Sequence, residues 1–177
     1  MEREFSDGVI ALRPLRLEDA AAHLAGEDAE TVRWLSAGVS DIAGTRSWIE
    51  RSTRHWRDGG PTFVFGIWQI SPRTLVGMIE ANTDHRQLDA VPRDGANISY
   101  GLHSQARGRG YMPRALALLE NFLRDLGVGV VVIRVDPQND ASLRVPGRSG
   151  FVFQETIASS QGDRLAIWHR RLDPPRT

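Results

Sequence analysis

The clearest pattern in the chain is a helical repeat of apolar positions between residues 112 and 126. Apolar side chains recur there at spacings of three and four residues, while charged and polar side chains fill the remaining positions. The apolar set comprises Met112, Ala115, Leu116, Leu119, Phe122, Leu123 and Leu126. This spacing predicts an amphipathic helix with one buried face, and Gly127 is expected to end it.

The rest of the chain alternates between strand and helix patterns. Runs rich in β-branched and aromatic residues predict strands at 9–15, 63–70, 74–82, 98–102, 128–135, 151–157 and 164–169. Helices are expected at 20–26, with Asp19 as its cap, at 29–35, at 43–56 and at 139–145, where Pro146-Gly147 should break the last one. Segment 83–95 is polar and is expected to be a loop. Without repeats or linkers, residues 1–177 are expected to form a single α/β domain.

Composition narrows the possible partners. The 177 residues include 22 acidic and 22 basic side chains, so no net charge favours nucleic acid or an anionic membrane as a partner. Cysteine is absent, which excludes disulfides and cysteine-based zinc sites, and no other metal-ligand spacing is present. With no apolar run of membrane-spanning length and no signal peptide, a soluble cytoplasmic protein without a metal is expected.

The loop Arg107-Gly108-Arg109-Gly110 lies between the strand at 98–102 and the helix that begins near residue 111. Glycines allow a ligand to approach the backbone, and the first N–H groups of a helix together with its dipole favour an anion. The two arginines add positive charge. The arrangement predicts a binding site for a pyrophosphate group.

This region resembles the acetyl-CoA-binding motif of the GNAT acyltransferase superfamily. The resemblance rests on Tyr100-Gly101-Leu102, on Arg107-x-x-Gly110-x-Met112, and on Asn139-x-x-Ser142 followed by Gly150-Phe151. The opening residues 12–20 are similar to the RimJ/RimL-like branch, which includes ribosomal-protein N-terminal acetyltransferases. The resemblance covers nearly the whole chain. It implies a GNAT fold: one mixed, mostly antiparallel sheet of about six or seven strands, splayed between 98–102 and 129–135, with flanking helices.

The same resemblance implies where acetyl-CoA binds. Its pantetheine arm would pair with the strand edge at Gly101 and Leu102, and the Leu102 region would supply an N–H to the thioester oxygen. Asn139 would contact the arm from the opposite side, and Ser142 would protonate the departing thiolate. The amides expected to hold the pyrophosphate are those of Arg107, Gly108, Arg109, Gly110, Tyr111 and Met112.

Two departures from the family pattern affect the chemistry. Many members have a tyrosine acid four positions before the closing Gly-Phe pair, where this chain has Pro146, so Ser142 is the better candidate. Met112 replaces a small residue at the end of the loop, and its side chain is expected to turn into the core. The base that deprotonates the amine is either a water chain or a side chain such as Glu80; the alternative for Glu80 is a solvated surface position.

The expected activity is transfer of an acetyl group from acetyl-CoA to a primary amine by direct attack, the amine being a protein N-terminus or a small molecule. The alternative is a CoA-binding sensor of the same fold that has lost the transfer activity. Trp34, Trp48 and Trp56 could line the acceptor pocket, although packing roles are expected for two of the three. Homodimers are common in the branch. The sequence specifies no particular acceptor.

Overall fold

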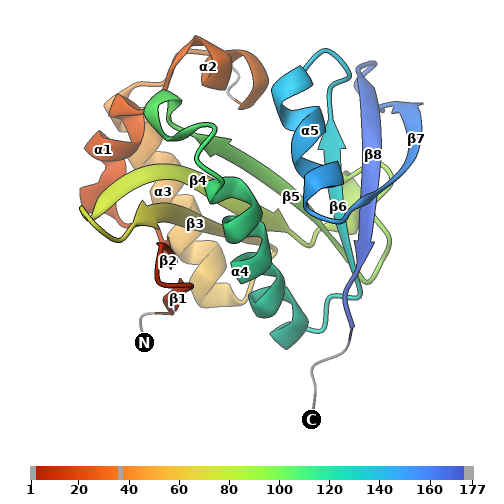
Figure 1. Cartoon of the computed structure of the whole chain (residues 1–177), viewed down its shortest axis with the longest axis horizontal. Helices are drawn as coiled ribbons and strands as arrows, with labels where there is room; N and C mark the ends of the chain where they lie inside the picture. The colour runs from red at the N-terminus through yellow and green to blue at the C-terminus, as the bar shows by residue number, and fades with distance from the viewer. Residues whose placement is uncertain (1–2, 36–37, 174–177) are drawn as a thin grey trace.

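The computed structural model describes residues 3–35 and 38–173, which form one eight-stranded sheet in the order β1-β2-β3-β4-β5-β6-β8-β7 (Figure 1). The strands are β1 (Phe5–Ser6), β2 (Ile10–Pro14), β3 (Thr62–Gln69), β4 (Thr74–Asn82), β5 (Gly95–Leu102), β6 (Val130–Val135), β7 (Val152–Ala158) and β8 (Arg164–Arg171). All neighbouring pairs are antiparallel except β5 and β6. The mixed, mostly antiparallel sheet expected from the sequence is confirmed, with β1 as an additional short strand.

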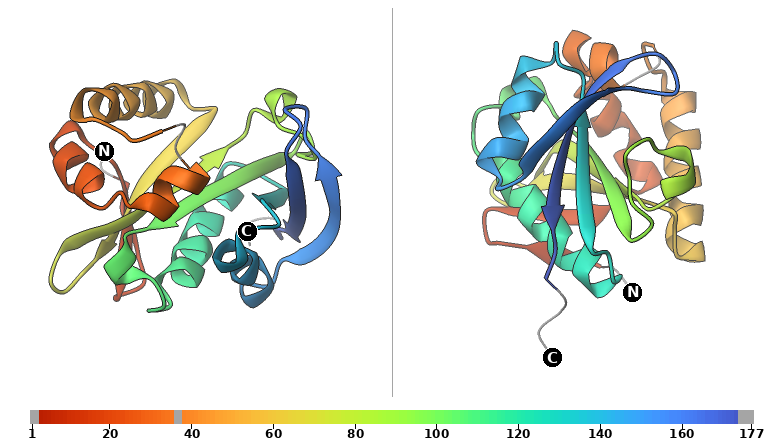
Figure 2. Two further views of the ribbon diagram at one scale, coloured as in Figure 1. Left: turned by 90° about the horizontal axis from the view of Figure 1, so that it is seen from above. Right: turned by 90° about the vertical axis from the view of Figure 1, so that its right-hand side faces the viewer.

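Five α-helices of the described residues cover the two faces of the sheet (Figure 2). They are α1 (Ala20–Ala25), α2 (Ala29–Leu35), α3 (Ile42–Asp58), α4 (Tyr111–Asp125) and α5 (Asp140–Arg148). The helices α1, α2 and α3 lie on one face, and α4 and α5 lie on the other. None of the described helices is both long and apolar enough to span a membrane.

The larger core lies between the sheet and α4. The apolar face of α4 is fully buried there, with Leu119, Phe122 and Leu123 at 0% exposure, and Phe122 packs edge-on against Phe65. Met112 points into this core, as expected. A smaller cluster on the opposite face packs residues of α1 and α3 against β3 and β4. The sheet is therefore fixed from both sides around its central strands.

Helix boundaries follow local capping chemistry. Asp41 caps α3 by accepting a hydrogen bond from the Gly44 amide at 2.7 Å, and Gly127 follows α4 with a φ of 78°. Asp19 is the N-cap residue of α1, as predicted, but its side chain accepts no hydrogen bond from that helix. Its carboxylate instead accepts hydrogen bonds from the Arg16 amide, which precedes the 3-10 turn 17–19, and from the Arg13 guanidinium on β2.

Two other boundary predictions are corrected by the structure. β5 begins at Gly95 rather than Ile98, because residues 95–98 pair in parallel with residues 130–133 of β6. The helix expected to end before Pro146 continues through it to Arg148. Proline has no backbone N–H, so one carbonyl inside the helix lacks its usual donor. Here a side chain donates to that carbonyl instead, as described below.

Candidate active site

β5 and β6 pair along only part of their length and then separate. Their ladder stops at Ile98 and Ile133, while β5 continues to Leu102, still paired with β4. The open space is a cleft of about 640 Å³, within the ordinary range for a small-molecule site. It is lined by β5, β6, α2, the start of α4, and α5. The splay expected between these two strands is thus present.

The separation leaves one backbone edge of β5 facing the cleft. The His103 amide donates to Val76 of β4 at 2.9 Å, and successive peptide groups in a strand point in opposite directions. The N–H groups of Tyr100 and Leu102 therefore point away from β4, toward the cleft. The Leu102 amide is therefore open to a group bound in the cleft.

The glycine loop enters the cleft at the N-terminus of α4. Gly108 and Gly110 both have φ of 74°, in the left-handed region that favours glycine, and no atom lies within 4 Å of a Cβ built on either. The helix begins at Tyr111, so the N–H groups of its first turn have no partner within the helix. Arg109 is exposed. Together these features suit a phosphate group.

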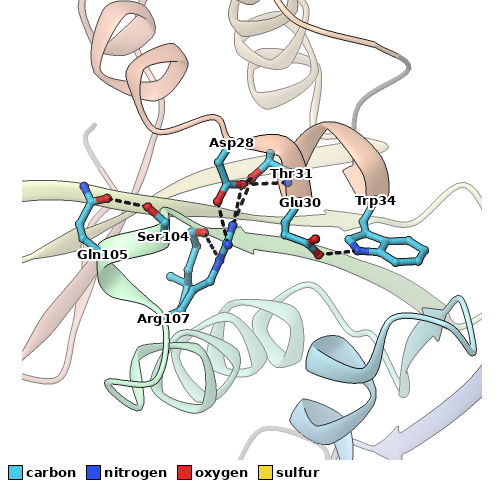
Figure 3. A network of polar contacts seen from close by, with 8 residues as sticks. Asp28, Glu30, Thr31, Trp34, Ser104, Gln105 and Arg107 are labelled. Atoms are coloured by element: carbon cyan, nitrogen blue, oxygen red, sulfur yellow. Dashed lines mark hydrogen bonds and ion pairs between the residues drawn. The ribbon is translucent and has the colours of Figure 1, made fainter.

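The Arg107 side chain points toward Asp28 and Thr31 (Figure 3). Its guanidinium pairs with both carboxylate oxygens of Asp28 at 2.8 Å, and its Nε donates to the Leu102 carbonyl at 3.0 Å. Asp28 also caps α2 by accepting from the Thr31 amide and hydroxyl, each at 2.9 Å. These donors hold the pKa of Asp28 well below its usual range, the Arg107 hydrogen bond most strongly. Arg107 thus links the glycine loop, the end of β5 and α2.

The opposite side of the cleft is the N-terminus of α5. Asn139 caps this helix, its Oδ1 accepting from the Ser142 amide at 3.0 Å, and both residues line the cleft. In an unbroken helix the Ser142 carbonyl would accept from the amide of residue 146, but Pro146 has none. The Tyr100 hydroxyl donates to that carbonyl at 3.4 Å. Tyr100 therefore joins β5 to α5 and compensates for the proline.

The face of the sheet under α2 forms the other half of the site. A Cβ on Gly101 would lie 2.6 Å from Leu35 of α2, so residues of β5 on the Gly101 side face that helix. Glu80 pairs directly with Ser99 on this side, and burial raises the pKa of its carboxyl. Ser99 lines the cleft, whereas Glu80 lies one strand beyond it.

The three tryptophans named above lie in different environments. Trp34 on α2 lines the cleft and donates from Nε1 to Glu30 at 2.9 Å. Trp48 stacks on His23, and Trp56 packs against Phe65 in the core. Two of the three therefore have packing roles. Among the residues that the structure describes, no group of three histidine or acidic side chains could hold a metal ion.

Two functional contacts were not anticipated from the sequence. Asp28 pairs with Arg107 across 79 positions of the chain, and Tyr100 reaches Ser142 across 42. The signals available were only indirect: an acidic residue preceding the predicted helix at 29–35, and a proline inside a helical pattern.

Comparison with known proteins agrees with this architecture. Residues 10–152 match the family described as the acetyltransferase (GNAT) domain. The chain is 26% identical over 99 residues to YycN of Bacillus subtilis strain 168, described as an uncharacterized N-acetyltransferase. That match covers 54% of this chain and only 60% of the relative's length.

Solved structures share the whole fold. RimL, a ribosomal alpha-N-protein acetyltransferase in complex with coenzyme A, superposes with a TM-score of 0.79 at 19% identity, over 98% of this chain and 99% of RimL. RimJ of Mycobacterium smegmatis, in complex with CoA-disulfide, superposes with a TM-score of 0.76 at 21% identity, over 96% of this chain and 86% of RimJ. With the family match covering most of its length, the chain belongs to the GNAT acetyltransferase family.

Proposed function

We propose that the protein transfers an acetyl group from acetyl-CoA to a primary amine by direct attack, without a covalent enzyme intermediate. The observation that carries this proposal is the cleft itself, where the open edge of β5 faces the capped N-terminus of α5 above a glycine loop that begins α4. When bound, acetyl-CoA supplies the activated thioester.

The residues present fit such a ligand. The amides of the glycine loop and Tyr111 would hold the pyrophosphate, and Arg144 and Arg148, which are exposed on α5 and line the cleft, would meet further phosphate charge. The edge at Gly101 and Leu102 would hold the pantetheine amides as an added strand. Each of these groups is presented from a wall of the same cleft.

Two side chains are proposed for proton transfer. The Leu102 amide would stabilise the developing oxyanion, and the Ser142 hydroxyl would donate a proton to the leaving thiolate. Glu80, with its raised pKa and its position beside Ser99, would accept the amine proton through water, since it does not line the cleft directly. The acceptor would approach from the α2 side, because α4 and α5 occupy the other face.

The test is release of CoA thiol from acetyl-CoA with a panel of primary amines: short peptides with free N-termini, free amino acids and polyamines. Amine-dependent thiol release and the matching N-acetyl product by mass spectrometry are expected. CoA binding by calorimetry without thiol release for any amine would contradict the proposal and favour a CoA sensor. The chain contains no lysine, so self-acetylation of lysine contributes no background.

A further inference from the structure

One charged residue interrupts the most hydrophobic strand of the sheet. β6 reads Val-Val-Val-Ile-Arg-Val, and its other members are buried between the two layers. Arg134 lies at the first position of β6 beyond its pairing with β5, and it lines the cleft. A guanidinium at such a position loses hydration, and burial accordingly lowers the pKa of Arg134.

The contacts of Arg134 within the described chain use only part of its hydrogen-bonding capacity. Its Nε donates to Asn97 Oδ1 at 2.9 Å, and Asn97 in turn donates to the Ser99 hydroxyl at 3.3 Å. Asp89 attracts the guanidinium from a greater distance, and no carboxylate of the described residues lies within the 4.0 Å of an ion pair. Arginine carries five donors, so its two terminal nitrogens remain available to a ligand.

Arg134 shares its side of the sheet with the acceptor half of the site. Ile133 and Ile98 are partners in the parallel ladder, so Arg134 lies on the same face as Asn97 and Ser99. Gly101, on this face, abuts Leu35 of α2. The guanidinium is therefore presented on the side from which an amine would approach.

We propose that Arg134 binds a carboxylate carried by the acceptor, so that the preferred substrates are primary amines with an acidic group a few bonds from the nitrogen. This inference rests on the proposed acetyl transfer. Arginine forms paired, charge-assisted hydrogen bonds with a carboxylate, and a partly dehydrated guanidinium gains most from such a partner. Asn97 holds the Nε side, which orients the terminal nitrogens.

The proposal also gives Arg134 an effect on reactivity. A fixed positive charge near the acceptor disfavours the ammonium form, and only the neutral amine can attack a thioester. Purely cationic acceptors such as polyamines would meet repulsion at this position. If Arg134 served only to support Asn97, a single hydrogen-bond donor at position 134 would be enough, and a glutamine could also supply it.

The experiment compares matched acceptor pairs in the thiol-release assay. One arm uses the amidated dipeptides Ser-Asp and Ser-Asn, and the other uses free aspartate and asparagine amide, so that an acidic peptide N-terminus is distinguished from a small amino acid. Spermidine is the cationic acceptor. For the wild-type protein we expect kcat/KM to be about 10- to 100-fold higher for the acidic member of at least one pair, as for one hydrogen bond to a charged group.

Arg134→Gln should abolish this preference by lowering kcat/KM for the acidic member much more than for the neutral member, and Arg134→Lys should retain part of the preference. Arg171→Gln, an exposed position on neighbouring β8, is the matched control and should keep the preference. Equal rates within both pairs, or a preference that survives in Arg134→Gln, would overturn the inference and leave acetyl transfer intact. Absence of thiol release with every amine would refute both.

Discussion

Pro146 and Tyr100 should be energetically coupled. Pro146 leaves the Ser142 carbonyl without its helical donor, and the Tyr100 hydroxyl occupies that acceptor at 3.4 Å. Tyr100→Phe removes the hydroxyl but keeps the ring, which packs against the main core. In the natural sequence this change leaves a partly buried carbonyl unsatisfied. In a Pro146→Ala background the amide of residue 146 can bond the same carbonyl, so the loss should be smaller.

The magnitude follows from the length of the bond. A typical intramolecular hydrogen bond contributes about 0.5–1.5 kcal/mol net, and at 3.4 Å this one belongs near the lower end. An unsatisfied buried carbonyl adds to the cost, so we expect Tyr100→Phe to destabilise the protein by about 1 kcal/mol and by less than about 0.5 kcal/mol with Pro146→Ala. Urea unfolding of the four proteins measures the cycle, and each kcal/mol corresponds to about 2–4 °C in Tm.

Tyr111→Phe provides the control for this cycle. The Tyr111 hydroxyl donates to Gln69 of β3 at 2.9 Å and shares no hydrogen-bond partner with Tyr100 or Pro146 among the described contacts, so its removal should cost the same in both backgrounds. If Tyr100→Phe also costs the same with proline and with alanine at 146, the hydroxyl does not replace the missing amide and the reasoning is refuted.

Three further predictions concern the cleft and the neighbouring strand β4. Ser142→Ala should lower kcat by about 100-fold or more with little change in Tm. Asn139→Ala should instead lose a helix cap and about 1 kcal/mol of stability. An unchanged kcat in Ser142→Ala would exclude the hydroxyl as the acid. Burial raises the pKa of Glu80, so the folded state keeps the Glu80 proton to higher pH than the unfolded chain does. The stability that the protonated Glu80 contributes is therefore full below about pH 4.3, and it is lost as the pH rises through the raised pKa. Glu80→Gln should therefore be more stable than wild type at pH 7, converge with it in acid, and acetylate more slowly; equal melting curves at both pH values would contradict the burial argument. Gly77→Ala should strongly destabilise the protein, because the new Cβ would lie 2.3 Å from the Gly101 carbonyl oxygen. Gly101→Ala should destabilise it less, because its Cβ meets only the end of the Leu35 side chain. Tm values in the reverse order would contradict this.

Local patterns were sufficient to predict most of the elements. The repeat at 112–126 specifies α4 because one face of that helix is buried almost completely, and the β-branched run at 128–135 specifies β6 for the same reason. β5 was placed too late in the chain. Its first residues, Gly95 and Asn97, have poor strand propensity, and they are extended because β6 pairs with them from a distant part of the sequence.

The site was predictable where it depends on the backbone, and less so where it depends on side chains. The positive φ of Gly108 and Gly110 and the cap by Asn139 are local properties of short motifs. The environment of Arg107 is not local, because Asp28 reaches it through the packing of α2 over the end of β5. A motif therefore located the loop without showing that its first arginine is already paired.

The charges in the cleft likewise depend on side-chain contacts between distant parts of the chain, and these charges bear on which acceptor the cleft prefers. The formal charge of the whole chain is zero, which led to no expectation about the charge of the acceptor. Charge in the cleft is arranged locally. Arg107 is neutralised by Asp28, and Arg144 and Arg148 face the cleft from α5. Arg134 has no ion-pair partner among the described residues and lies on the acceptor side. A substrate responds to these positions and not to the sum over the surface, because exposed charges more than about 10 Å apart are largely screened at physiological salt. If Arg134 binds the acceptor as proposed, the preference for acidic amines should persist at high salt, since a partly buried pair is screened less, and its loss at 0.5 M salt would indicate only long-range attraction.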